Sequence, residues 1–486
     1  MQTEVYTPSQ RILVLGLGHS GAAAAYWCAH QGWSVRLADT RPTPPDIDEL
    51  RQALSEADAQ WVLGSEALDE AVLQGVCTLV LSPGLSPHEP RLKALLEKAE
   101  EQGIECINEL TLFARALAQA AQQRDYHPQL IAITGTNGKT TVATMVAHLL
   151  REHEISVQLA GNISPSCMSA WLAAQQTGLW PEVWVLECSS FQLHSMQDLH
   201  PDVATVLNIS QDHLDWHVSA SDYQNDKMRL LQQAKRVVYH RDDPIVCRAA
   251  QALSQPQWSF GRQQPEQERQ LGIFVDAQDR RWLAVCDAAG QYTQLLPCGS
   301  LSVLGEHNES NALAALALLA ALDWPIRQMA EALSRYRGEP HRCEWVRDVR
   351  DVRFINDSKG TNVGATVAAI QGIEAPKILI AGGLGKGQDF TPLAEAIRAG
   401  DVRHTVLYGA DAARIAQTLR ECDLPHSMVA QLDSAVEQAF GFASARDVVL
   451  FSPACASMDQ FENYQARGRA FVDAVSELAL DLGEVQ

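Results

Sequence analysis

A glycine-rich segment with a single lysine carries the clearest chemical signal in this sequence. Its residues are Gly135, Thr136, Asn137, Gly138, Lys139, Thr140 and Thr141. Because the segment follows an apolar run and precedes a helical pattern, its backbone N–H groups can surround phosphate oxygens, while the lysine neutralises charge and a hydroxyl reaches Mg²⁺. A plain glycine turn needs neither the lysine nor the two hydroxyls. The segment therefore predicts a nucleotide phosphate site, although it is shorter than the common GxxxxGK[ST] loop.

Candidate metal ligands follow two further apolar runs. Glu187 ends one run, and His213, with Asp212 and Asp215 beside it, follows the next. Because the carboxyl ends of parallel strands share one edge of a sheet, a carboxylate there can hold Mg²⁺ directly or through water. Without the phosphate loop, Glu187 would be interpreted as a cap and His213 as a structural histidine. With the loop, both are predicted to bind metal.

Lys227 has two interpretations. It follows Tyr223 at a spacing that puts both side chains on one face of a predicted helix. On composition alone, a solvated helix lysine is the simpler interpretation. A role at the predicted phosphate and metal site is the alternative.

A second glycine-rich segment lies near the N-terminus and has the sequence Gly16-Leu17-Gly18-His19-Ser20-Gly21. It follows an apolar run and opens an Ala-rich helical pattern, an arrangement in which the backbone can approach a phosphate. Asp39 ends the next apolar run, where an acid often meets a ribose. Taken alone, this pair indicates a nicotinamide-dependent dehydrogenase. The structural alternative is a tight turn with Asp39 as a cap.

The elements that must position these residues alternate along the chain as short β-rich runs and helical stretches, which predicts α/β layers with mostly parallel sheets. One set of predicted strands covers 11–15, 34–38 and 78–81. A second set covers 130–134, 182–186, 203–208 and 236–240. A third set covers 353–356, 377–381, 404–408 and 447–451. Junctions near Asn108 and in the 337–340 turn separate the sets. Three α/β domains are therefore predicted, 1–108, 109–338 and 339–486, of which the outer two are Rossmann-like and the central one is of the P-loop ATPase type.

Composition narrows the function classes. The 486-residue chain has a net charge of −21, which argues against a broad nucleic-acid interface. The eleven cysteines are scattered without a CxxC pair, which gives zinc and redox motifs no support and favours a reducing compartment. Neither an N-terminal signal segment nor a membrane span is expected.

Taken together, these motifs resemble the Mur ligase family over nearly the whole chain. The shared motifs are the 135–141 loop, Glu187 with the following SSFQ, Asp212-His213 with Asp215, Lys227, the Gly305–Asn308 segment with Asn311, Pro340-His341-Arg342, and Asn356-Asp357-Ser358-Lys359. Two longer strings, DSKGTN at 357–362 and SPACASMDQF at 452–461, are most similar to members that add D-glutamate. The Asp-Asn-Pro-Arg motif of the diaminopimelate-adding members is not found.

The resemblance implies a role for each domain. The N-terminal domain would bind the UDP part of UDP-N-acetylmuramoyl-L-alanine, the central domain ATP, and the C-terminal domain the amino acid. The expected UDP-substrate residues are Gly18, His19, Ser20, Asp39, Thr40, Arg41, Gly84 and Asn162. The expected amino-acid residues are Thr361, Lys386, Ser457, Met458 and Tyr464, where Tyr464 stands at a position that is often Phe in the family. The first glycine loop would then hold a substrate nucleotide without hydride chemistry.

The resemblance also implies the ATP and metal ligands. The expected ATP contacts are the 135–141 loop with Asn308, Asn311, Arg342 and Asp357. Thr140, Glu187, His213 and Lys227 would hold two Mg²⁺ ions, with Lys227 carbamylated by CO₂, because a cationic amine cannot ligate a metal whereas carbamate oxygens can. Lys139, His213, Lys227 and Lys359 are the expected catalytic residues. Asp226 stands next to Lys227 where a small residue is expected.

The implied activity is ATP-dependent ligation through an acyl phosphate, by a cytoplasmic monomer that contributes position and electrostatics. An NAD-dependent oxidoreductase would leave the phosphate loop and Glu187 without a role. A nucleotide switch that hydrolyses ATP would leave the 452–461 string without one. A folylpolyglutamate synthase-like ligase is a nearer alternative, but a separate UDP-binding domain at its start is not expected. D- and L-glutamate are not distinguished by the sequence.

Overall fold

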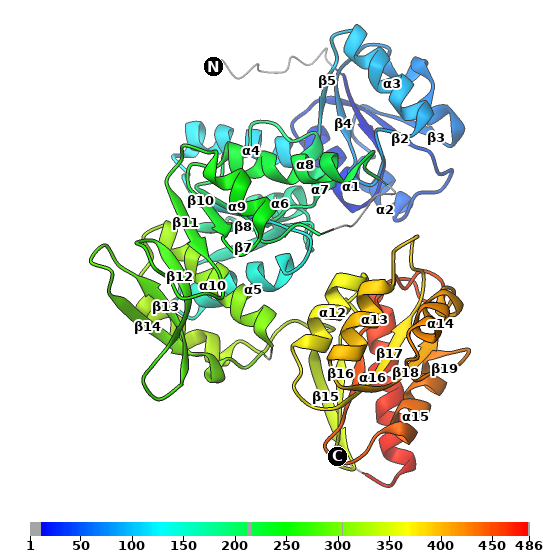
Figure 1. The fold of residues 1–486 in the computed structure, drawn as a ribbon. Coiled ribbons are helices and arrows are strands. Elements are labelled where there is room, and N and C mark those ends of the chain that lie inside the picture. Colours follow the sequence, from blue (N-terminus) through cyan, green and yellow to red (C-terminus); the bar gives the residue numbers. More distant parts are fainter. Residues whose placement is uncertain (1–10, 211–215, 304, 485–486) are drawn as a thin grey trace. The chain divides into compact units, whose positions relative to one another are not determined.

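The structure is a computed structural model that describes residues 11–210, 216–303 and 305–484. Strands and helices alternate through most of the chain and build three sheets (Figure 1). The described residues also form short 3₁₀ helices at Ser65–Leu68, Glu70–Leu73, Cys298–Ser300 and Ala330–Arg335. Within the described part of the chain, every helix is too short or too polar to cross a membrane.

The N-terminal sheet has the strand order β3-β2-β1-β4-β5, and all its pairs are parallel. Its strands are β1 Arg11–Leu15, β2 Ser34–Asp39, β3 Ala59–Leu63, β4 Val76–Leu81 and β5 Glu105–Ile107. Its helices are α1 His19–His30, α2 Ile47–Ala53 and α3 Pro90–Glu101. Since side chains alternate along a strand, Ile12 and Val14 pack with α1, whereas Leu13 and Leu15 pack with α3. The strand order reverses between β1 and β4, so the loops that follow these two strands lie side by side.

The central sheet has nine strands in the order β14-β13-β12-β11-β10-β9-β6-β8-β7. Its strands are β6 Gln129–Thr134, β7 Val157–Gly161, β8 Val183–Glu187, β9 Val203–Val206, β10 Val237–His240, β11 Gln257–Phe260, β12 Gln270–Val275, β13 Arg281–Cys286 and β14 Tyr292–Pro297. The helices of this region are α4 Glu109–Arg124, α5 Lys139–Arg151, α6 Cys167–Thr177, α7 Ser190–His194, α8 Ala220–Gln233, α9 Pro244–Gln251, α10 Glu306–Ala321 and α11 Ile326–Met329. β6 is parallel to its two neighbours, β8 and β9. The carboxyl ends of these three strands therefore meet at one edge.

The C-terminal sheet has the order β15-β16-β20-β17-β18-β19, in which β15 is antiparallel to β16. Its strands are β15 Glu344–Val349, β16 Val352–Asn356, β17 Lys377–Gly382, β18 Val402–Tyr408, β19 His426–Met428 and β20 Val448–Phe451. Its helices are α12 Val363–Gln371, α13 Thr391–Ala399, α14 Ala412–Glu421, α15 Leu432–Phe442 and α16 Tyr464–Asp481. Alternation again divides the strand residues, because Leu379 packs with α12–α14 and Ile380 with α15 and α16 on the other face (Figure 1).

The chain divides into two compact units by its internal contacts. The first runs through Phe274 and also holds Ala284–Leu295 and Ala314–Ala330. The second holds Val275–Leu283, Leu296–Leu313 and the described residues from Glu331 onward. The predicted α/β layers with mostly parallel sheets are confirmed, whereas the boundaries after residues 108 and 338 stay predictions.

Candidate active site

The phosphate loop lies between β6 and α5, as the sequence predicts. Gly135 has φ +149°, and a Cβ there would lie 3.0 Å from Leu207 Cβ, so a larger residue would be strained and crowded. Gly138 has φ +86° and is the N-cap of α5. The loop thus ends at a helix N-terminus, where free N–H groups and the helix dipole favour an anion.

The loop is braced by its own side chains and by the end of β9. The Asn137 N–H donates to Asn208 Oδ1 at 2.8 Å, and Asn208 Nδ2 donates back to the Asn137 carbonyl at 3.0 Å. Lys139 Nζ donates to the carbonyls of Gly135 and Thr136, at 3.0 and 2.8 Å. These two bonds hold the lysine amine within the loop that it is predicted to serve.

Thr140 and Glu187 meet beside the loop. The Thr140 hydroxyl donates to Glu187 Oε2 at 2.7 Å, and Asn162 Nδ2 donates to Glu187 Oε1 at 2.9 Å. Gly161 permits the close approach of Asn162, because a Cβ at Gly161 would lie 2.2 Å from the Glu187 carbonyl oxygen. This buried hydroxyl and carboxylate are oxygen donors of the type that Mg²⁺ prefers, so the residues fit a magnesium ion.

Another predicted metal ligand, His213, and the acids beside it, Asp212 and Asp215, lie outside the described residues. Among the residues that are described, no group of three or more His, Cys, Asp or Glu side chains could hold a metal ion. Any metal set built on Glu187 and Thr140 must therefore draw further ligands from elsewhere.

Lys227 is buried, with 2% of its surface exposed, so the interpretation as a solvated helix lysine is wrong. Its Nζ donates to the Gly135 carbonyl at 2.8 Å and lies 4.7 Å from the centre of the Tyr223 ring. The Tyr223 hydroxyl lies 2.9 Å from Thr136 Oγ1. The shared helix face predicted from the sequence thus places both side chains against the phosphate loop.

Asp226 forms a buried polar cluster next to Lys227. Its Oδ2 lies 2.9 Å from His194 Nδ1 and 3.4 Å from His217 Nδ1, and its Oδ1 lies 3.4 Å from Arg229 Nε. Burial pushes the pKa of Asp226 up, but the two histidines and Arg229 outweigh it and lower this pKa to about 2. The larger residue at this position is therefore accommodated by partners from α7 and from the segment before α8. The sequence reasoning missed these partners.

The predicted UDP residues other than Asn162 gather at the carboxyl edge of the N-terminal sheet, whereas Asn162 follows β7 of the central sheet and bonds Glu187. Gly18 is the N-cap of α1, and a Cβ on Gly21 would lie 1.8 Å from the Gly16 carbonyl oxygen, so helix and loop touch there. A Cβ on Gly16 would lie 2.6 Å from Ser82 Cβ, which brings the Ser82–Gly84 loop alongside. His19, Thr40 and Gly84 are exposed, and Ser20 is half-buried.

Asp39 is engaged inside the chain. Its Oδ2 accepts the Leu17 N–H at 2.6 Å, and its Oδ1 accepts the Arg41 N–H and Nε at 2.9 and 2.8 Å. Burial raises the pKa of Asp39, but its bonds from Arg41 and Leu17 leave that pKa below the ordinary value. The carboxylate therefore holds both the glycine loop and the exposed Arg41. Asp39 thus has the structural role of the alternative interpretation, and it lies among the predicted UDP residues.

In the second unit, Asp357 is a buried carboxylate at the end of β16. Its Oδ2 accepts the Ser452 hydroxyl at 2.6 Å, and its Oδ1 accepts the Cys343 N–H at 3.2 Å. Burial raises the pKa of Asp357 to about 6, although Ser452 and Arg342 lower it. Within the described residues, the buried Nε of Arg342 has no hydrogen-bond partner. These two predicted nucleotide residues thus lie close enough to interact electrostatically.

Two further predicted nucleotide residues, Asn308 and Asn311, share the first turns of α10, and Asn311 Nδ2 donates to Asn308 Oδ1 at 3.1 Å.

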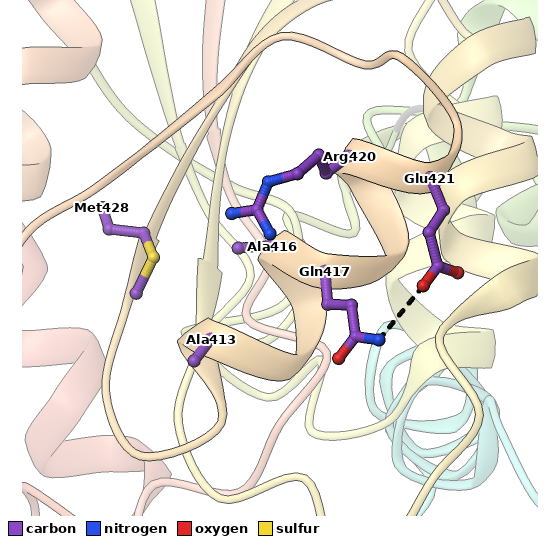
Figure 2. A pocket seen from close by; sticks show the side chains of 6 residues that line it. All are labelled: Ala413, Ala416, Gln417, Arg420, Glu421 and Met428. Atoms are coloured by element: carbon purple, nitrogen blue, oxygen red, sulfur yellow. Dashed lines mark hydrogen bonds between the residues drawn. The ribbon is translucent and has the colours of Figure 1, made fainter.

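A surface groove, shown in Figure 2, is a separate feature. It is lined by Ala413, Ala416, Gln417, Arg420, Glu421 and Met428, none of which is a predicted site residue. The groove is therefore set aside as a candidate active site.

Lys359 and Tyr464 also come together, with Lys359 Nζ 5.0 Å from the centre of the Tyr464 ring. Arg467, on the same helix as Tyr464, is a fully buried residue that the sequence reasoning missed. Its Nη2 donates to the Ser358 carbonyl at 2.7 Å, and its Nη1 to the Cys455 carbonyl at 3.0 Å. Arg467 therefore joins the segment that carries Lys359 to the segment that carries Ser457. An isolated arginine in a helical pattern gave no signal for this role.

The predicted amino-acid residues lie on two loops that pair with each other. Leu384 and Ala456 exchange two backbone hydrogen bonds, both 2.9 Å long. This bridge brings the loop of Lys386 next to the loop of Ser457 and Met458. Lys386 and Met458 are exposed and Ser457 is buried, while Thr361 lies half-buried directly before α12.

Comparison with known families and proteins gives matches over most of the chain. Three family models match the chain: Mur ligase MurD-like N-terminal domain over residues 10–108, Mur ligase middle domain over 133–319, and Mur ligase glutamate ligase domain over 341–455. A UDP-N-acetylmuramoylalanine–D-glutamate ligase of Bordetella parapertussis is 45% identical, over 98% of this chain and 97% of its own length. The enzyme of that name from Burkholderia multivorans is 44% identical, over 97% and 98%.

The chain belongs to the Mur ligase family. The resemblance stated from the motifs is therefore confirmed, and with it the prediction that this is a ligase. Membership of this ATP-dependent family implies ATP and Mg²⁺. The roles of individual residues stay predictions.

Solved structures agree on the fold. The UDP-N-acetylmuramate–alanine ligase MurC of Thermotoga maritima has a TM-score of 0.59 at 18% identity, with 96% of this chain and 99% of that one covered. A pseudomurein peptide ligase type C of Methanothermus fervidus has a TM-score of 0.57 at 17% identity, with 96% and 100% covered. At these identities the likeness supports the Mur ligase fold alone.

Proposed function

We propose that this chain adds D-glutamate to UDP-N-acetylmuramoyl-L-alanine with conversion of ATP to ADP and phosphate, in the synthesis of peptidoglycan precursors. The observation that carries the proposal is the identity of about 45% over nearly the full length with ligases of that name. The intact phosphate loop and the paired loops of Lys386 and Ser457 support it. We further propose a cytoplasmic monomer with domains at 1–108, 109–338 and 339–486.

The chemistry would begin at the phosphate loop. Lys139 would move from its loop carbonyls onto the outer phosphates of ATP, and the N-terminus of α5 would stabilise their charge. The substrate carboxylate would attack the γ-phosphate, which gives an acyl phosphate and ADP. The glutamate amine would then attack the activated carbonyl, and phosphate would leave. Because the protein supplies position and charge, closure around the substrates would also keep water from the acyl phosphate.

The proposed metal set comprises Thr140, Glu187, His213 and Lys227, of which Lys227 would first be carbamylated by CO₂. Two Mg²⁺ ions, when bound, would withdraw charge from the transferred phosphoryl group. The buried position of Lys227 supports this assignment, since its amine lies 2.8 Å from the Gly135 carbonyl of the phosphate loop, and a carbamate on it would supply the oxygen ligands that Mg²⁺ prefers. Asn162 would hold Glu187 in place and face the substrate.

The remaining proposed roles are contacts with the UDP moiety, with ATP and with glutamate. Gly18, His19, Ser20, Asp39, Thr40, Arg41 and Gly84 would bind the UDP moiety. On the ATP side, Asn308 and Asn311 would approach the adenine, Arg342 the phosphates and Asp357 the ribose. Lys386 would pair with one carboxylate of glutamate, and Ser457 with the Met458 N–H would bind the other. Lys359, Thr361 and Tyr464 would border the reacting groups.

Phosphate release in the presence of ATP, Mg²⁺ and UDP-N-acetylmuramoyl-L-alanine tests the proposal. Release that depends on D-glutamate is expected, with L-glutamate, L-alanine and diaminopimelate as comparison acceptors. Equal release without any acceptor would indicate a nucleotide hydrolase instead. Release with L-glutamate and none with D-glutamate would keep the ligase but overturn its acceptor. A shift of the melting temperature by the UDP substrate and none by NAD would exclude the dehydrogenase.

A further inference from the structure

The loop that carries Lys386 has an unusual backbone. Gly382, Gly383 and Gly387 have φ of +133°, +126° and +77°, and Lys386 itself has φ +49°. A left-handed lysine is strained, because its Cβ crowds the following carbonyl. Such a conformation persists only where the surrounding structure holds it. The residues that hold this loop therefore decide where the Lys386 side chain points.

Asp411 is the side chain that holds the loop directly before Lys386. The Gly385 N–H donates to Asp411 Oδ2 at 2.7 Å, and the Asp411 N–H donates to the Gly383 carbonyl at 2.9 Å. The fit is close, since a Cβ on Gly385 would lie 2.8 Å from Phe390 Cζ and 3.2 Å from Asp411 Oδ2. Asp411 thus makes two bonds to the three-residue stretch Gly383–Gly385.

The orientation of Asp411 is not that of a helix cap. It stands at the N-cap position of α14, where an aspartate typically accepts a backbone N–H of its own helix. Among the described residues, it makes no such capping bond. Its Oδ1 instead faces Arg414 Nη1 at 3.1 Å, and its Oδ2 faces the lysine loop. Asp411 therefore leaves α14 without a side-chain cap and accepts a charge-assisted hydrogen bond from the loop instead.

The same turn also holds the opposite loop. We call Gly409–Asp411, which follows β18, the brace turn. The Ala410 N–H donates to Asp459 Oδ2 at 2.9 Å, two residues beyond Ser457. Asp411 therefore ties the brace turn to the loop of Lys386, and Ala410 ties it to the loop of Ser457. The Leu384–Ala456 bridge joins the two loops directly, so that the three segments form one closed set of bonds.

We propose that Asp411 is a positioning residue for the acceptor amino acid: it fixes the Gly385 N–H, and through it the direction of Lys386, against the loop of Ser457. This inference rests on the proposed function, which assigns the two loops to glutamate. Asp411 does not touch the substrate in this account. Its removal changes the acceptor site by loosening the separation between the two groups that bind the carboxylates.

Steady-state kinetics with each substrate varied in turn test the proposal, with Asp411→Ala, Asp411→Asn and Arg414→Ala beside the wild type. Loss of a hydrogen bond to a charged group predicts a rise of about ten- to a hundredfold in KM for glutamate with Asp411→Ala. The KM for ATP should stay within about twofold, because the phosphate loop lies on other elements. Asp411→Asn keeps an acceptor oxygen and should restore KM to within about threefold of the wild type.

Arg414→Ala is the matched comparison, since it removes the other partner of Asp411 and leaves the bond to Gly385. Arg414 also donates to the Gln388 carbonyl at 3.4 Å, so this variant should raise the KM for glutamate less than Asp411→Ala does. Equal changes of both KM values in Asp411→Ala, or no rescue by Asp411→Asn, would overturn the positioning role. If Asp411→Ala does not fold, Asp411→Glu replaces it, and a normal KM for glutamate there would count against the proposal. A wild type without glutamate-dependent phosphate release would overturn the proposed function and this inference together, whereas an active wild type with unchanged variants would overturn this inference alone.

Discussion

Asp357→Asn should make the protein more stable and less active at the same time. Burial raises the pKa of Asp357 to about 6, compared with about 3.9 for an exposed aspartate. At about 1.36 kcal/mol per unit, the buried charge costs the native state up to about 3 kcal/mol above pH 6. Asparagine carries no charge, its oxygen can still accept the Cys343 N–H, and its NH2 group can donate to the Ser452 hydroxyl in place of accepting from it. Imperfect replacement of these two bonds lowers the expected gain to about 1–3 kcal/mol.

The pH dependence gives this prediction its sign. Because the folded-state pKa of Asp357 is raised, the native protein binds the proton more tightly than the unfolded chain. The wild type therefore becomes more stable as the pH falls from about 6 to about 4, and it loses that stability as the pH rises through 6. The neutral variant has no such step. The advantage of the variant should be largest at pH 8 and should shrink to about half at pH 5.

Thermal unfolding without nucleotide at pH 8 and pH 5 measures the effect. A gain of about 1–3 kcal/mol corresponds to an increase of roughly 2–10 °C in the melting temperature of a unit of this size. The KM for ATP should rise about ten- to a hundredfold, because a charged acceptor is lost from the proposed ribose site. Asp348→Asn is the control, since Asp348 is an exposed carboxylate that is paired with Arg353. A lower melting temperature of Asp357→Asn at pH 8, or the same gain at both pH values, would refute the reasoning.

Four further substitutions test the site. Lys139→Ala should abolish phosphate release and leave the circular dichroism spectrum unchanged, and near-normal turnover would reject the ATP site. Lys227→Ala should lose most activity and regain part of it with added acetate, whereas a variant equal to the wild type would remove Lys227 from the metal set. Lys386→Ala should raise the KM for glutamate on the order of thirty- to several-thousandfold with little change for ATP; the reverse pattern would move Lys386 to the nucleotide site. Arg467→Ala leaves two buried carbonyls without a donor and should cost about 3 kcal/mol or more in thermal unfolding, and an unchanged melting temperature would contradict its bridging role.

The sequence predicted the parts of this molecule that are encoded locally. A strand such as β6 is a continuous apolar run that is buried on both faces, and a phosphate loop is a short string with its own logic. Both can be recognised within a few residues. The rule that the carboxyl ends of parallel strands share an edge predicted that Glu187 lies at the edge of the phosphate loop, whereas the order of β6, β8 and β9 came from the structure alone.

Two of the strands that the sequence reasoning missed, β13 and β15, lack such a pattern. β13 begins with an exposed arginine, and β15 contains the exposed Trp345, because these strands are covered on one face or pair at the border of a sheet. Their residues alternate weakly, and neighbouring loops are as polar as they are. Periodicity is least informative where a strand is half solvated.

The site residues that were missed share a different property. Arg467 meets Ser358 across 109 residues, and Asp411 meets Gly385 across 26. A single arginine or aspartate in a helical pattern usually faces solvent, so its type and spacing do not reveal a distant partner. Such a partner becomes known only when the fold of the intervening chain is known.

Two buried carboxylates near predicted site lysines have pKa values that are shifted in opposite directions. Asp226 stands beside Lys227, and its pKa is lowered to about 2 because His194, His217 and Arg229 surround it. Asp357 stands two residues before Lys359, and its pKa is raised to about 6 because burial outweighs its partners. The first charge is matched inside the chain and stabilises the fold. The second is retained at a cost, which selection tolerates where a group must meet a ligand. Neutralisation of Asp226 should therefore destabilise the protein, and neutralisation of Asp357 should stabilise it, although both substitutions remove one buried negative charge near a lysine of the proposed active site.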